Sequence, residues 1–249
     1  MLKHFFKHCI LLFHPFSSFL FKRDKIIHPY LCIITPVFDP ALKPLKDLIR
    51  DLQSQTFPHF IHVSISNGLS PKIKKYISKL QKNDPRFIYD QLKFQPTPDW
   101  QKLLINIGKR RTYAFRKYDA VRYVFIDANS RVANNSYIAK LYMSDSFVKK
   151  DIIITQTLFP DSTLLPFFPI NVGRIDITNY SFSRSIARKF RYPQNIDPEY
   201  GPANDFRFFK KINHKNNTVF FPFLGIKKDV SHSYKSIGRL FHDTIGNIK

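Results

Sequence analysis

Apolar runs of strand length recur along the first half of the chain. The segment LCIITPV at 31–37 is β-branched and apolar throughout, which is typical of a strand buried on both faces. Further strands are predicted at 60–65, 86–90 and 121–127. Runs that are uniformly apolar, with no polar alternation, favour a parallel sheet that helices cover on both sides.

Segments with helical spacing of apolar residues separate these strands. Leu45, Leu48 and Leu52 lie three or four positions apart, which predicts an amphipathic helix over 41–54. Two further helices are predicted at 71–82, where Pro71 suits a helix N-terminus, and at 100–117. The β-α-β-α-β-α-β order predicts an α/β fold with a single, Rossmann-like, mostly parallel sheet and flanking helices.

The second half of the chain is less regular. A strand is predicted at 151–158, helices near 179–190 and 203–213, and a late strand at 217–223 that a basic tail follows. No internal repeat or low-complexity linker interrupts the chain. We therefore expect one domain over 31–249 with an N-terminal extension over 1–30.

The extension mixes Phe and Leu with Lys and His. Its most apolar run, Cys9–Phe21, is interrupted by His14-Pro15 and is shorter than the roughly 20 residues that span a bilayer. No small-residue cleavage site follows the run, as a signal peptide would require. Two interpretations stay open: a basic and aromatic segment on a membrane surface, or an extra helix packed on the domain.

Composition narrows the function class only in part. With 43% hydrophobic residues the chain is globular, and Cys9 and Cys32 are too few for a disulfide scaffold, a four-cysteine zinc site or an iron–sulfur cluster. A cytoplasmic location is expected, with peripheral contact at the inner face of a membrane as one possibility. The net charge of +22 fits nucleic acid, an anionic membrane or a phosphorylated substrate. Nucleic acid ranks last, because no helix-turn-helix, zinc finger or aromatic RNA-binding motif occurs.

Three segments fall at the carboxyl ends of predicted strands. They are 35–39, 66–70 and 127–129. In an open α/β sheet, ligands bind beyond the carboxyl ends of the strands, so these segments are the expected binding residues.

Several motifs together resemble family 2 glycosyltransferases of the GT-A fold. They are ITPVFDP, SQTFPHF, SNGLS, GKRRTYAFRKYDAVRYVFIDANSRV (108–132), NVGRIDITNYSFSRSIARKF (171–190) and GPANDFRFFKKI (201–212). Their order and spacing match over roughly residues 31–240. The resemblance implies metal-assisted transfer of a sugar, with inversion, from a nucleotide-diphosphate donor to a hydroxyl group. We expect a UDP-sugar as donor and a glycan or lipid-linked acceptor, such as a lipopolysaccharide-type glycan at a membrane.

The resemblance also implies roles for individual residues. Asp127 and Asn129 match the Asp-x-Asp motif that holds Mn²⁺ or Mg²⁺, His232 matches a late metal or phosphate contact, and Asp205 matches the catalytic base. A divalent cation would neutralise the diphosphate as it leaves. The expected donor-binding residues are Thr35, Pro36, Val37, Phe38, Ser66, Asn67, Gly68, Lys109, Arg110, Arg111 and Ala128.

Three positions depart from the family pattern. Ser66, Asn129 and Asn204 stand where the family commonly has an acidic residue, and each substitution removes a negative charge. The losses weaken the expected metal affinity and leave the donor undecided. They also motivate an alternative, a degenerate relative that binds a nucleotide or glycan without catalysis.

Each candidate also has an ordinary structural interpretation. Asp127 and the tripeptide 66–68 suit turns, Asp205 suits the start of a helix, and Lys109–Arg111 suits a solvated helix face. Asp176 is a candidate for either helix capping or acceptor binding. The sequence alone leaves these alternatives open.

Overall fold

The computed structural model describes residues 28–68, 70–93, 99–166, 168–170, 174–195, 204–214 and 217–228. Nearly all of the predicted extension at 1–30 lies outside these residues, and so does His232. The predicted domain boundary therefore stays a prediction.

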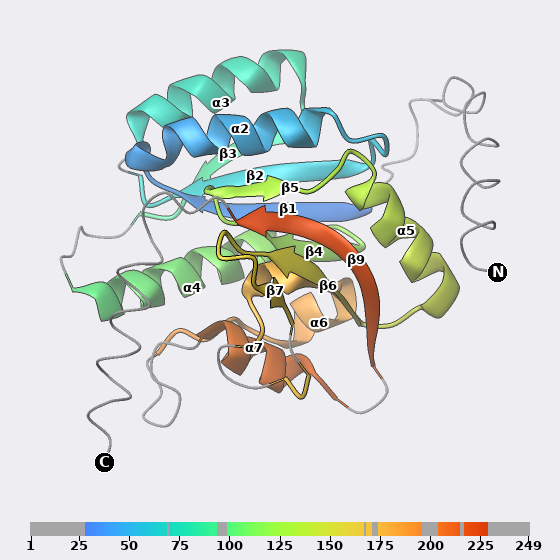
Figure 1. Cartoon of the computed structure of the whole chain (residues 1–249). Coiled ribbons are helices and arrows are strands. Elements are labelled where there is room, and N and C mark those ends of the chain that lie inside the picture. The colour runs from blue at the N-terminus through green and yellow to red at the C-terminus, as the bar shows by residue number, and fades with distance from the viewer. Residues whose placement is uncertain are drawn as a thin grey trace.

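A single sheet forms the centre of the described structure (Figure 1). Its first four strands are parallel, in the order β3 (Phe87–Gln91), β2 (Phe60–Ser66), β1 (Leu31–Val37) and β4 (Arg122–Phe125). The order continues with β8 (Tyr180–Ser183), β6 (Ile152–Leu158), β9 (Thr218–Lys228) and β5 (Ser130–Val132), and β7 (Leu164–Leu165) pairs with β6. β8 is antiparallel to β4 and β6, whereas β9 is parallel to β6.

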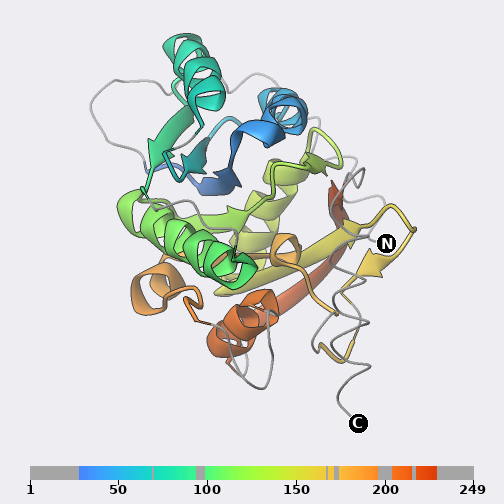
Figure 2. The ribbon, with the colours of Figure 1, turned by 90° about the vertical axis from the view of Figure 1, so that its left-hand side faces the viewer.

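Helices cover both faces of the sheet (Figures 1 and 2). On one face lie α2 (Leu42–Gln53) and α3 (Pro71–Asn83), with α5 (Tyr137–Val148) packed into the same core. On the other face lie α4 (Trp100–Lys117), α6 (Arg184–Lys189) and α7 (Asn204–Ile212). Two short 3₁₀ helices, η1 (Asp39–Ala41) and η2 (Ile177–Asn179), complete the described elements.

The burial of β1 on both faces explains why its sequence is apolar at every position but Thr35, whose hydroxyl contacts His62. Leu31 and Ile33 belong to the core under α2 and α3, while Cys32 and Ile34 belong to the core under α4, α6 and α7. Because successive side chains of a strand point to opposite faces, a strand covered on both sides needs apolar residues on both faces. The predicted run at 31–37 is confirmed as a strand.

Two predictions for the second half are wrong in part. The helix expected near 179–190 is the strand β8 followed by α6, because Tyr180 and Phe182 pack into the core between β4 and β6. Ser183 then accepts a hydrogen bond from the Ile186 amide and starts the helix. The expected basic tail after 223 begins as part of a strand, since β9 continues to Lys228 and pairs with β5. The helix α5 was not predicted.

Among the described residues, no helix is both long enough and apolar enough to cross a membrane.

Candidate functional site

The polar segments predicted to bind a ligand meet at one edge of the sheet. Val37 at the end of β1 lies beside Ser66 at the end of β2, and Ile34 lies beside Phe125 on β4. Asp127 comes two residues after Phe125, so it leaves the sheet at the same edge. The parallel arrangement therefore gathers these segments where α/β sheets bind ligands.

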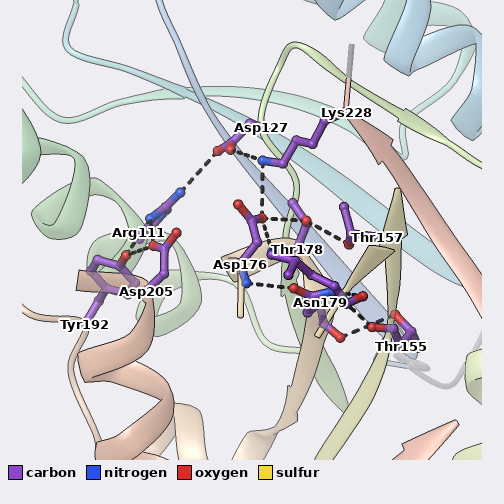
Figure 3. Close-up of polar contacts among 11 residues, drawn as sticks. Arg111, Asp127, Thr155, Thr157, Asp176, Thr178, Asn179, Tyr192, Asp205 and Lys228 are labelled. Atoms are coloured by element: carbon purple, nitrogen blue, oxygen red, sulfur yellow. Dashed lines mark hydrogen bonds and ion pairs between the residues drawn. The ribbon is translucent and has the colours of Figure 1, made fainter. Parts of the chain in front are cut away.

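Asp127 joins two basic side chains from distant parts of the chain (Figure 3). Arg111 Nη2 on α4 lies 3.2 Å from Asp127 Oδ1, and Lys228 Nζ at the end of β9 lies 2.7 Å from Asp127 Oδ2. The side chains of Arg111 and Lys228 are only 7% and 6% exposed, whereas that of Asp127 is 35% exposed. One carboxylate at the surface thus holds two buried cations.

Arg111 continues the network to a second carboxylate. Its Nη1 donates to Tyr192 Oη at 2.7 Å and lies 3.2 Å from Asp205 Oδ1, and Tyr192 also donates to Asp205 Oδ1. The guanidinium lies over the rings of Tyr192 and Phe125. The solvated-face interpretation of 109–111 is therefore wrong for Arg111, and also for Arg110, because both are buried among specific partners.

The absence of a side chain at Gly108 allows this contact between α4 and the Tyr192 segment. A Cβ atom at Gly108 would lie 2.3 Å from the Pro193 carbonyl oxygen and 3.0 Å from the Tyr192 ring. Only glycine lets the helix approach the segment this closely. The glycine therefore determines where Tyr192 meets Arg111.

Lys228 continues the network in the other direction, to Asp176. Its Nζ lies 3.2 Å from Asp176 Oδ1 (Figure 3). Asp176 also accepts from the Thr178 amide at 2.9 Å and forms a reciprocal capping box with Asn179 at the start of η2. The capping role considered for Asp176 is found, and the same carboxylate also partners a buried lysine.

Opposing effects set the protonation of the two carboxylates nearest Arg111. Burial raises the pKa of Asp127, but the charges of Lys228 and Arg111 outweigh burial and lower it to about 2. Burial raises the pKa of Asp205 above its usual value, and Arg111 offsets this only in part. Asp127 is therefore a permanent anion near neutral pH, while Asp205 holds a proton more readily than an ordinary aspartate.

Both basic side chains stay charged despite their burial. Burial lowers the pKa of Lys228, but Asp127 and Asp176 outweigh it and leave the pKa above its usual value. Burial likewise lowers the pKa of Arg111, and Tyr192, Asp205 and Asp127 together leave it raised. The network therefore alternates acidic and basic groups, as Asp205, Arg111, Asp127, Lys228 and Asp176.

The ligands expected for a divalent cation can be compared with this geometry. Both carboxylate oxygens of Asp127 already have a cationic partner, and Asn129 offers an uncharged side chain where a second carboxylate is usual. No three His, Cys, Asp or Glu side chains in the described part of the chain lie together as a metal site. In this arrangement the described residues do not fit a divalent cation at Asp127.

The expected donor-binding residues at the ends of β1 and β2 differ in exposure. Thr35 is fully buried and its Oγ1 lies 3.0 Å from His62 Nε2, whereas Phe38 is 56% exposed. Ser66 is fully buried, and its Oγ accepts from the Gly68 amide at 3.0 Å in a turn where Gly68 has φ of +93°. The hydrogen bond from the Gly68 amide to Ser66 thus agrees with the interpretation of 66–68 as a turn.

Arg110 connects the helix α4 to the end of β1. Its Nη1 lies 3.4 Å from the Val37 carbonyl oxygen. Burial and the nearby Arg111 lower the pKa of Arg110 to about 10, so it stays charged at neutral pH. Ala128 is buried directly after Asp127, and Lys109 and Pro36 are partly exposed.

Two residues of the network were not among the sequence candidates. Tyr192 lies in a segment without a motif, so no local signal marks it. Lys228 had a signal: Ile226 and Lys228 share one face of β9, and a lysine on the buried face of a strand needs an acidic partner. Interpreting the segment after 223 as a basic tail overlooks this pattern of a strand with a buried face.

Known structures share this architecture. S. aureus TarS 1–349 in complex with UDP superposes with a TM-score of 0.66 at 14% identity, over 81% of this chain and 61% of that one. The same protein in complex with UDP-GlcNAc gives a TM-score of 0.64 at 12% identity, over 82% and 59%. The mannosyltransferase PcManGT from Pyrobaculum calidifontis, in complex with GDP-Man and Mn²⁺, gives 0.59 at 12% identity, over 100% and 72%.

These comparisons establish the fold. The chain has the GT-A fold, with its curled, mostly parallel sheet and flanking helices, as the sequence predicts. It spans about 60% of the TarS 1–349 chains. No protein-family model and no curated protein sequence matches the chain.

Proposed function

We propose that the protein is a glycosyltransferase of the family 2 type that moves a sugar from a nucleotide-diphosphate donor to a hydroxyl group. The observation that carries this proposal is the convergence of Asp127, Arg111 and Asp205 at the ligand-binding edge of a GT-A sheet. Proteins with the same fold bind UDP, UDP-GlcNAc and GDP-Man. Those complexes and the sequence resemblance support a nucleotide-sugar donor. Among such donors, a UDP-sugar is the one that we propose first.

Asp205 is proposed as the base that accepts the proton of the acceptor hydroxyl. Both hydrogen bonds that the described residues make to its carboxylate fall on Oδ1, so Oδ2 is directed to no described donor. A raised pKa makes a carboxylate a stronger base. Attack by the activated hydroxyl on the face opposite the diphosphate would invert the anomeric carbon, as the family resemblance implies.

The proposal for the acceptor rests on the net charge of the chain and not on the geometry of the site. A net charge of +22 suits a phosphorylated or membrane-associated glycan, for example a lipid-linked or lipopolysaccharide-type acceptor. Contact of residues 1–30 with a membrane surface belongs to the same proposal. The resemblance implies Mn²⁺ or Mg²⁺, and the mannosyltransferase of similar fold is in complex with Mn²⁺, but the described residues do not fit a divalent cation at Asp127, so the proposal includes no metal.

The alternative function is nucleotide or glycan binding without catalysis. It is favoured by Ser66, whose buried hydroxyl is engaged in a turn and which replaces the acidic residue that the family commonly has. This alternative shares the binding step with the transferase and differs only in turnover.

One experiment separates the two. The chain is first tested for thermal stabilisation by UDP, GDP and CDP, with and without Mn²⁺, and then for donor hydrolysis and transfer with the sugars of the nucleotide that binds. Replacing Asp205 with Asn is expected to reduce turnover by about 10²- to 10⁴-fold while nucleotide binding is kept. Asp161→Asn, at an exposed position after β6, is the control and is expected to leave turnover unchanged.

Each outcome has a distinct meaning. Binding together with turnover that Asp205→Asn removes supports the transferase. Binding with no turnover for any donor supports the alternative. The proposal is overturned if no nucleotide stabilises the protein and no donor is consumed.

A further inference from the structure

We propose that the Lys228 ammonium, with the Arg111 guanidinium, supplies the positive charge that faces the donor diphosphate, in the place that the resemblance assigns to a divalent cation. The inference rests on the proposed function and adds to it the residues that would neutralise the leaving group. It would make donor binding independent of added metal.

The first argument is that both carboxylate oxygens of Asp127 already have a basic side chain as partner. Lys228 Nζ lies 2.7 Å from Oδ2 and Arg111 Nη2 lies 3.2 Å from Oδ1, so each carboxylate oxygen that would ligate a cation contacts a cationic group. A metal at this carboxylate would have to displace at least one buried ion pair. Breaking such a pair leaves an uncompensated buried charge, which is costly.

The second argument is that the fold holds Lys228 at this position. In the ladder between β9 and β5, Lys228 pairs with Ser130, which lies three residues after Asp127 in the sequence. Gly225, on the same strand, packs so closely that a Cβ there would lie 2.6 Å from the Tyr137 ring. Strand register therefore places Lys228 next to the motif that contains Asp127. Its ammonium group does not depend on a flexible side chain alone to reach that motif.

The third argument concerns the capacity of Lys228 to bind a further anion. An ammonium group carries three N–H bonds; Asp127 accepts one of them at 2.7 Å, and Asp176 lies 3.2 Å away as a second, ion-pair partner. A phosphate oxygen can accept the third. Charge-assisted hydrogen bonds to phosphate are among the stronger polar contacts in proteins.

The fourth argument is the loss of a carboxylate at Asn129. A second aspartate in the motif would strengthen a cation site, and it would also compete for the two basic side chains. With Asn129, the network of ion pairs around Asp127 contains two basic groups, Arg111 and Lys228, and three acidic ones, without the fourth carboxylate that a second aspartate in the motif would add. The substitution thus weakens metal binding and reduces the negative charge that would oppose the diphosphate.

The reaction balances with these residues alone. The acceptor oxygen forms a bond to the anomeric carbon while the bond from that carbon to the diphosphate oxygen breaks. The electron pair of the broken bond stays on the nucleoside diphosphate, where Lys228 and Arg111 stabilise the added negative charge. The hydroxyl proton passes to the Asp205 carboxylate.

The test measures nucleotide affinity by calorimetric titration of the full chain with UDP, GDP and CDP, once in excess EDTA and once in Mn²⁺. Equal affinity in the two conditions is expected for the wild-type chain. Lys228→Gln is expected to weaken binding in EDTA by about 10- to 100-fold, the equivalent of one charged hydrogen bond. Lys227→Gln is the matched control, because Lys227 is the neighbouring residue of β9 and is exposed.

The outcomes separate this inference from the proposed function. Binding that requires Mn²⁺ in the wild-type chain, or a Lys228→Gln variant that binds as the wild type does in EDTA, overturns the inference and leaves the transferase proposal intact. No binding under either condition overturns the proposed function itself. The wild-type comparison decides the question even where Lys228→Gln fails to fold, and Lys228→Arg, which keeps the charge, is expected to retain part of the affinity.

Discussion

A buried arginine lies at each end of β4, Arg122 on the strand itself and Arg111 on α4 beside Asp127, and the two arginines use their donors differently. At the amino end, Arg122 donates to Asp145 at 2.7 Å and to the main-chain carbonyls of Lys150, Asp151 and Ser181 at 2.9 to 3.2 Å. At the carboxyl end, Arg111 contacts the side chains of Asp127, Asp205 and Tyr192. Most acceptors of Arg122 belong to the backbone, whereas all three partners of Arg111 are titratable side chains.

The difference separates a structural arginine from a functional one. The carbonyls that Arg122 contacts lie directly before β6 and on β8, where the backbone is held in place, so Arg122, which is 1% exposed, fastens the start of β4 to its surroundings. The partners of Arg111 come from three separate segments, and two of them, Asp127 and Asp205, are about one third exposed. A ligand can therefore reach the carboxylates that Arg111 holds, but not the acceptors of Arg122.

The largest expected effect comes from removing Arg122. Arg122→Met leaves the Asp145 carboxylate and several buried carbonyls without their donor, which should lower the free energy of unfolding by about 3 to 5 kcal/mol. Urea denaturation measures this loss. Nucleotide affinity of the folded fraction should be unchanged, since the arginine lies at the end of β4 opposite to Asp127.

The control for this variant is an exposed ion pair. Arg50 pairs with Asp47 on α2, and its side chain is 70% exposed. Arg50→Met should cost less than about 1 kcal/mol. If Arg122→Met were as mild as Arg50→Met, or if it abolished nucleotide binding in folded protein, the division between the two ends of β4 would be wrong.

Local sequence was sufficient for the longer elements that have a sequence pattern of their own. The strand at 31–37 and the helix at 100–117 were predicted with the bounds observed, because continuous burial or helical periodicity marks every residue. The strand β5 has only three residues, Ser130–Val132, and forms because β9 lies beside it. Such an element has no periodic pattern of its own, so it could not be predicted.

The candidate site likewise contains residues that the sequence predicts and residues that it does not. Asp127 and Asp205 were found because motifs surround them, and the structure brings both to Arg111. Lys228 meets Asp127 across 101 positions of sequence, and Tyr192 meets Arg111 across 81. These contacts depend on strand register and helix packing, which a single sequence does not encode locally.

A smaller effect is expected from a change that disturbs only the carboxyl end of β4. In Gly108→Ala the new methyl group would lie 2.3 Å from the Pro193 carbonyl oxygen, so the segment that carries Tyr192 must move away from α4. Overpacking of this kind costs about 1 to 3 kcal/mol, and the higher helix propensity of Ala returns up to about 1 kcal/mol. We expect a net loss of about 1 to 2 kcal/mol in urea denaturation, together with weaker nucleotide binding.

Lys102→Ala is the control for this variant, because Lys102 lies on the same helix and its side chain is 70% exposed. It should change neither stability nor binding by a measurable amount. Unchanged stability and binding in Gly108→Ala would contradict the close approach of α4 to the Tyr192 segment.

The smallest expected effect is the acid dependence of the Asp127 ion pairs. The pKa of Asp127 is lowered from 3.8 to about 2 in the folded protein, mainly by Lys228 and Arg111 acting against burial. A carboxylate with a lowered pKa stabilises the folded state at pH values above its unfolded pKa, and this contribution disappears as the pH falls through the folded pKa. The contribution should therefore be complete above about pH 4 and lost near pH 2. Because the side chain is 35% exposed, solvent screening reduces it to about 1 kcal/mol.

The measurement compares wild type with Asp127→Asn by urea denaturation between about pH 2 and pH 6. The variant lacks the titrating group, so the stability difference between the two proteins should be present at pH 6 and shrink toward pH 2. Asp205 acts in the opposite direction, since its raised pKa favours proton uptake by the folded state, and Asp127 contributes to that rise. The comparison is therefore repeated in an Asp205→Asn background, where this group does not titrate. A stability difference that stayed constant down to pH 2 would mean that the Asp127 carboxylate gains nothing from Arg111 and Lys228. The carboxyl end of β4 would then lack the electrostatic coupling that distinguishes it from the Arg122 end.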